Sequence, residues 1–199
     1  MVTPLAASCV VALGVLVPSA VSAGPAVWRG TVNISTALQD TDTFGNSESY
    51  TYTARAVFPG RAYPGFNRSR WHGTLAYSFS GTEVRVLLDG SCRWTASDSY
   101  PVEADIYRGG GEGDPARLAV SIYFSPASRS WGKAVTAECT GYDIPRSSRP
   151  EEILPVVESA EFVLPPKTRT FARSLRLKVR GGIQGLEGRA TVRISFALR

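Results

Sequence analysis

The chain has 199 residues, 43% of them hydrophobic, and a formal net charge of +5. This length is sufficient for one ordinary domain with a sizeable core, and the composition excludes a disordered polar chain. Arginine supplies 19 of the 22 basic side chains, a bias that indicates a GC-rich, bacterial genome.

The first 23 residues have the pattern of a secretory signal peptide. An apolar run from Leu5 to Val17 precedes Pro18, and Val21 and Ala23 occupy the −3 and −1 positions of a cleavage site. The competing alternative of a transmembrane anchor needs roughly 20 apolar residues, more than this run contains. We therefore expect a signal peptide at 1–23, a single domain at 24–199, no transmembrane segment in the mature chain, and a secreted or extracytoplasmic location.

Two cysteines, Cys92 and Cys139, remain after cleavage at Ala23. An even pair in an oxidising compartment predicts one disulfide bond, with two buried free thiols as the alternative. By the chain-entropy model, closing the loop between these two cysteines would add roughly 4 kcal/mol to the free energy of unfolding. Two distant thiols and a single histidine lack the spacing of a zinc site, so we expect neither a metal nor a cofactor.

Alternation of apolar and polar residues, typical of half-buried strands, recurs along the mature chain. In 28–38, for example, Val32 and Ile34 share one face while Asn33 and Ser35 take the other. Similar runs cover 50–58, 71–79, 83–88, 92–94, 102–107, 118–124, 135–139, 157–164, 175–179 and 192–198. In 83–88 the pattern predicts Val84, Val86 and Leu88 inward, with Glu83 and Arg85 outward. No stretch of a dozen mature residues has the apolar spacing of a helix.

These strands predict an all-β fold. We expect a single antiparallel two-layer β-sandwich of about nine or ten strands, immunoglobulin-like or jelly-roll-like in architecture. The alternative is a β-barrel of 8–10 strands, including a small outer-membrane barrel. A short internal echo, Trp-x-Gly-Thr at 28–31 and 71–74, has no third copy and is explained by two strands with similar core positions.

Candidate catalytic and metal-binding groups are few. Glu103 and Asp105 fall on one strand face, where two carboxylates could serve a glycosidase-like hydrolase. The loop from Asp40 to Glu48 resembles a calcium loop in composition but lacks the ligand positions of an EF-hand. A looser calcium site would use the oxygen ligands of Asp40, Asp42, Asn46 and Glu48, and a solvated loop is the alternative. His72, the single histidine, is expected on the outer face, opposite Trp71. We therefore expect no catalytic residues and a non-enzymatic protein, with the hydrolase as the alternative.

The strongest feature is the basic C-terminal hairpin. Residues 167–199 contain nine basic side chains against Glu187 alone, a local charge of +8 that leaves −3 for the rest of the chain. Alternation places several cations on one surface, and the candidate anion-binding residues are Arg176, Lys178, Arg180, Arg189 and Arg193. Two interpretations of this surface stay open: its cations are solvated or paired with carboxylates of a neighbouring strand, or they bind an anionic polysaccharide or other cell-surface component. We expect no nucleic acid as the partner, because no aromatic residues alternate with these cations.

Overall fold

The computed structural model describes residues 26–62, 70–109, 117–124, 135–141, 147–148, 154, 157, 159–181 and 186–199. Strands account for 84% of these residues, so the all-β prediction is confirmed. Within these ranges, no helix is both long and apolar enough to cross a membrane. The expected signal peptide lies outside the described residues.

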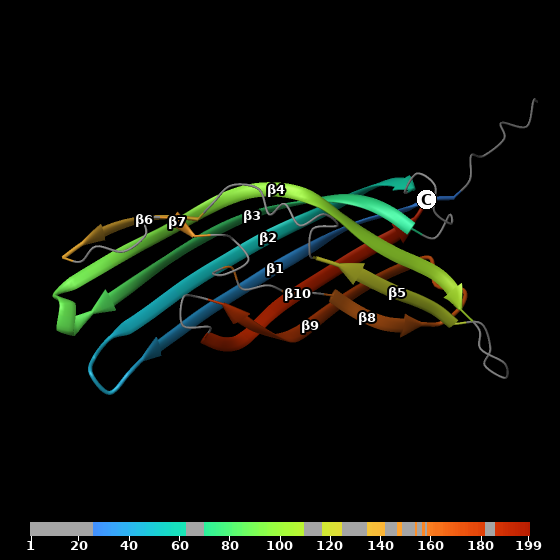
Figure 1. Ribbon diagram of the computed structural model, residues 1–199. Coiled ribbons are helices and arrows are strands. Elements are labelled where there is room, and N and C mark those ends of the chain that lie inside the picture. Colours follow the sequence, from blue (N-terminus) through green and yellow to red (C-terminus); the bar gives the residue numbers. More distant parts are fainter. Residues whose placement is uncertain are drawn as a thin grey trace, which may run out of the picture.

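Ten strands and one 3-10 turn follow one another along the described parts of the chain (Figure 1). They are β1 (Trp28–Thr41), β2 (Ser47–Ala62), β3 (Arg70–Arg85), η1 (Val86–Leu88), β4 (Gly90–Gly109), β5 (Arg117–Tyr123), β6 (Val135–Thr140), β7 (Ser147–Ser148), β8 (Ser159–Leu164), β9 (Thr170–Gly181) and β10 (Leu186–Leu198).

These strands form one antiparallel sheet in the order β7-β6-β4-β3-β2-β1-β10-β9, with β5 paired to β4 and β8 paired to β5. The long strand β4 has two neighbours on one side, because Ser91–Thr95 pairs with β6 and Glu103–Gly109 pairs with β5. The sheet curls into a half-barrel, with β5, β8 and β9 below the long strands β1–β4 (Figure 1). The described strands thus form one curled sheet, whereas a sandwich would divide them between two sheets. This arrangement is closer to the barrel alternative than to the sandwich.

The inner face of the curl holds the hydrophobic core. Along β1, β2 and β3, buried and exposed residues alternate almost without interruption, as expected for strands with one wet face. Val32, Ala56 and Leu75 are fully buried at the centre of this face. Serine and threonine are the most frequent residues on the outer face of the same strands. The alternation fixes the register, because a one-residue slip would expose the core.

Glycines on the inner face leave room for large neighbours. Gly30 pairs with Phe196 on one side and Phe58 on the other, and a Cβ atom at Gly30 would overlap the ring of Phe196. Gly73 likewise accommodates the ring of Phe58. Both glycines belong to the Trp-x-Gly-Thr echo, so the echo reflects two equivalent core positions. Glycines covered by aromatic rings are also a common device for bending a sheet.

Aromatic rings bridge the gap between β8 and β9. Among the described strands no ladder joins these two, although a turn with a Thr168 N to Pro165 O hydrogen bond of 3.1 Å connects them. The ring centroids of Phe171 and of Phe162 in β8 are 5.7 Å apart, and the Phe171 ring also packs against Trp28 and Phe196. Side-chain packing therefore takes the place of backbone pairing where the half-barrel is open.

The predicted orientation of residues 83–88 is wrong. Residues 70–85 form one uninterrupted strand, so the phase set by Trp71 continues and places Glu83 on the inner side, 3% exposed. Val86 and Leu88 lie in the 3-10 turn and are more than half exposed. The apolar residues of 84–88 suggested a new strand with its own inner face. Instead, the alternation of β3 continues to Arg85, and the apolar residues that follow lie in the turn.

Candidate functional site

The basic hairpin projects its cations from the outer face of the sheet. All five predicted anion-binding residues are exposed: Arg176, Lys178 and Arg180 on β9, and Arg189 and Arg193 on β10. Their strands are hydrogen-bonded neighbours, so the structure brings the five together on one surface, as the sequence predicted.

The register determines which of these cations face one another. Lys178 lies directly opposite Arg189, whereas Arg180 lies opposite Glu187. Arg176 and Arg193 lie opposite the neutral residues Thr191 and Ser174. Like charges directly opposite each other destabilise a sheet. Repulsion between Lys178 and Arg189 therefore lowers the stability of the sheet, and a bound anion would offset this repulsion.

The sheet extends this basic surface to a residue that the sequence analysis missed. Arg193 of β10 pairs with Asn33 of β1, and Asn33 pairs on its other side with Arg55 of β2. Arg55 is far from the C-terminal hairpin in sequence, and the local pattern marked it only as an outward position. It joins the site because β1 lies between β2 and β10.

A groove of about 450 Å³ lies at this point of the outer face. Two adjacent cross-strand rows form it: Arg193, Asn33, Arg55 and Ala76 in one row, and Thr191, Ser35, Thr53 and Ser78 in the next. Within the described part of the chain, no carboxylate lies at ion-pair distance from Arg55 or Arg193. The groove therefore combines several hydroxyl groups with two guanidinium groups that no described carboxylate neutralises.

The carboxylates considered for hydrolysis are held in an ion-pair cluster. Arg70 makes a bidentate contact with Asp105, at 2.9 and 3.0 Å, and lies 3.5 Å from Glu103. These contacts, led by the hydrogen bond to Asp105, raise the pKa of Arg70. The two acids share one outer strand face, as predicted, but both are engaged by the arginine. His72, half-buried on the same face, lies opposite Glu103 in the register.

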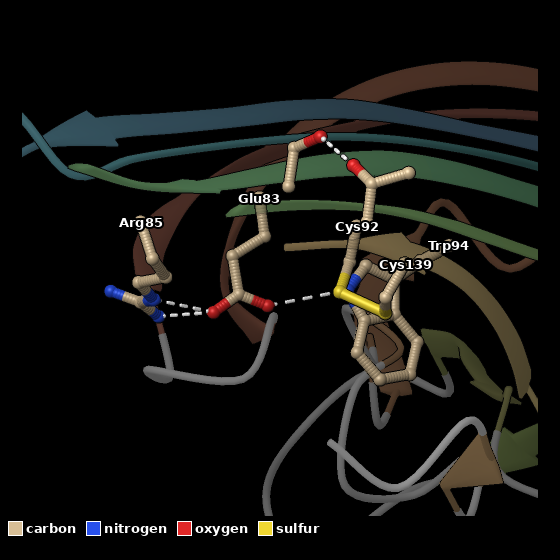
Figure 2. Close-up of a disulfide and its surroundings, with 7 residues drawn as sticks. Glu83, Arg85, Cys92, Trp94 and Cys139 are labelled. Carbon is tan, nitrogen blue, oxygen red and sulfur yellow. Dashed lines mark hydrogen bonds and ion pairs between the residues drawn. A yellow bond between two sulfur atoms is a disulfide. The ribbon is translucent and has the colours of Figure 1, made fainter. Parts of the chain in front are cut away.

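A second polar cluster lies on the inner face beside the disulfide bond (Figure 2). Arg85 donates to Glu48 at 2.8 Å and to Glu83 at 2.6 Å, and both glutamates are almost fully buried. Tyr50 donates to Glu48, and Trp94 donates to Glu83 at 3.4 Å. Burial alone would lower the pKa of Arg85, but its hydrogen bonds and charge interactions with the glutamates outweigh burial and raise it.

The predicted disulfide bond is present in this region. Cys92 of β4 and Cys139 of β6 are directly opposite in the register, and their sulfur atoms are bonded next to the Trp94 ring (Figure 2). The bond fixes β6 to the first part of β4. It lies on the inner side of the sheet, away from the basic outer face.

The loop between β1 and β2 does not assemble the four oxygen ligands considered for calcium. Asp42 accepts hydrogen bonds from the backbone of Phe44 and Asn46 and from the Asn46 side chain, so it stabilises the turn. Glu48 faces the inner side and binds Arg85. No cluster of three or more metal-ligating side chains occurs in the described ranges.

Comparison with known proteins returned no matching family model, no matching curated protein and no matching solved structure.

Proposed function

We propose that the chain is a secreted, non-enzymatic bacterial protein that binds an anionic polymer of the cell surface through the outer face of β9 and β10. The observation that carries this proposal is the exposed pairing of Lys178 with Arg189. A folded protein that retains like charges opposite each other gains stability when an anion binds between them. The exposed Arg176 and Arg193 extend the same surface and add to its attraction for a polyanion.

Retention on a heparin column tests the proposal. The triple variant Arg176→Ser, Lys178→Ser, Arg180→Ser should elute at a clearly lower salt concentration than the unaltered protein. Each cation near an anionic surface contributes about 1 kcal/mol at low salt, so the three together correspond to roughly a 100-fold change in affinity.

The matched control removes three exposed cations from other strands, β2, β4 and β5: Arg61→Ser, Arg93→Ser and Arg117→Ser. Both triple variants lose the same net charge. If they elute together, binding reflects overall charge, and the assignment to the β9–β10 face is overturned.

A further inference from the structure

We infer that the groove between Arg55 and Arg193 is a subsite for one acidic sugar unit of the bound polymer. This inference rests on the proposed function, because it assigns the ligand class of the same basic surface. It adds residues of β1, β2 and β3 to a site that the sequence placed on β9 and β10 alone.

The row that contains Arg55 and Arg193 would bind the acidic group of the sugar. Arg55 and Arg193 are separated by Asn33, so their Cα atoms are two strand spacings apart, about 10 Å. Both side chains line the same groove, and no described carboxylate neutralises either of them. Planar guanidinium groups bind carboxylate, sulfate and phosphate oxygens through paired hydrogen bonds.

The neighbouring row supplies hydroxyl groups. Thr191, Ser35, Thr53 and Ser78 are consecutive cross-strand partners and lie one row, roughly 7 Å, from the arginine row. Hydroxyl groups both donate and accept hydrogen bonds, as the hydroxyls of a sugar do. The groove volume of about 450 Å³ is within the range of small-molecule sites.

The remaining lining disfavours nucleic acid as the ligand. Tyr77 is the aromatic residue among the described lining residues, and its side chain is buried on the inner side of the sheet, 5% exposed. The described lining therefore offers no exposed ring on which a base could stack. Towards β9, Thr191 pairs with Arg176, so the groove is continuous with the basic hairpin. A glycan chain that crosses the strands would contact both.

Isothermal titration with four probes tests the inference: polygalacturonate, dextran sulfate, inorganic polyphosphate and neutral dextran. The variant Arg55→Gln, Arg193→Gln should bind the two acidic glycans at least about tenfold more weakly, because charge-assisted hydrogen bonds are lost. The control Arg61→Gln, Arg93→Gln removes two exposed cations outside both the groove and the basic hairpin and should bind the two acidic glycans as the unaltered protein does.

The hydroxyl row has its own matched pair of variants. Thr53→Val, Ser78→Ala should weaken binding of the acidic glycans about three- to tenfold and leave polyphosphate binding unchanged, because polyphosphate has no sugar hydroxyls. The control Thr51→Val, Ser80→Ala alters the adjacent row of the same two strands, outside the groove. It should change neither the binding of the acidic glycans nor the binding of polyphosphate. Equal loss of polyphosphate binding in the first variant would overturn the sugar assignment.

Other outcomes separate this inference from the proposed function. If Arg55→Gln, Arg193→Gln binds normally while the β9 triple variant does not, the groove assignment fails and the basic hairpin remains the site. If the unaltered protein binds none of the three anionic probes, or binds neutral dextran equally well, both proposals fail. Circular dichroism of each variant confirms that it is folded.

Discussion

Arg85 holds two carboxylates together in the interior of the curl. Glu48 and Glu83 are directly opposite in the register of β2 and β3, and each is at most 4% exposed. Repulsion between them is offset by Arg85 and by the hydrogen bonds from Tyr50 and Trp94. Loss of one partner from such a buried cluster leaves charge without compensation.

We therefore expect Arg85→Met to reduce the free energy of unfolding by about 3–5 kcal/mol at pH 7. Urea denaturation measures this value. The control Arg93→Met removes an exposed arginine from β4 and should change stability by no more than about 0.5 kcal/mol. Equal stability of the two variants would contradict a structural role for the buried cluster.

Asp42 provides a prediction with a defined pH dependence. Its hydrogen bond from the Asn46 side chain, 2.8 Å long, is the main cause that lowers the pKa of Asp42 below 3.8. Because the pKa is lower in the folded state, the ionised carboxylate stabilises the turn above the unfolded pKa. This contribution is lost as pH falls through the folded pKa.

In an NMR titration, Asn46→Ala should raise the pKa of Asp42 towards 3.8. Asn33→Ala, on the outer face of β1, serves as the control and should leave that pKa unchanged. An unaltered pKa of Asp42 in Asn46→Ala would contradict this, because it would show that the backbone hydrogen bonds from Phe44 and Asn46 alone lower the pKa.

Strand β10 has a central position that its place at the end of the sequence does not suggest. It pairs with β1 on one side and β9 on the other, and Val192, Ile194 and Phe196 are at most 2% exposed. Burial of each of these side chains is worth about 1.5–3 kcal/mol. Leu198, also expected inward, is only half-buried at the end of the strand.

Truncation after Glu187 should therefore abolish folding, despite the usual tolerance of chain ends. Circular dichroism and limited proteolysis of the truncated chain measure this outcome. The full-length control Arg189→Ser, Arg193→Ser keeps every buried residue of β10 and should remain folded. A truncated chain with cooperative thermal unfolding would show that the sheet forms without β10.

Strand prediction succeeded where apolar and polar residues alternate over a long run, and it failed where charged residues occupy inner positions. The inner and outer positions of 28–38, 50–58 and 71–79 follow directly from period two, and the structure reproduces them. In 83–88, two charged residues occupy inner positions because Arg85 and the glutamates compensate one another across strands. No local pattern contains that information, because the partners are distant in sequence.

The balance of charge differs between two parts of the outer face. Cations outnumber acids over β9, β10, β1 and β2, whereas the acids Glu103, Asp105 and Glu161 lie over β4 and β8. The sequence indicated this asymmetry from the excess of basic residues after position 167. The structure adds that the basic region extends across the sheet to Arg55, which no count along the chain could show.

The all-β fold, the Cys92–Cys139 bond and the exposure of the cations on the C-terminal hairpin could be predicted from the amino-acid sequence alone. Each of these depends on short-range alternation or on a count of residues, both of which are properties of the chain read in order. The tertiary structure decided the curl into one half-barrel sheet, the inner glutamate–arginine cluster and the groove between Arg55 and Arg193. These features depend on which strands become neighbours, and that is set by packing between segments far apart in the sequence.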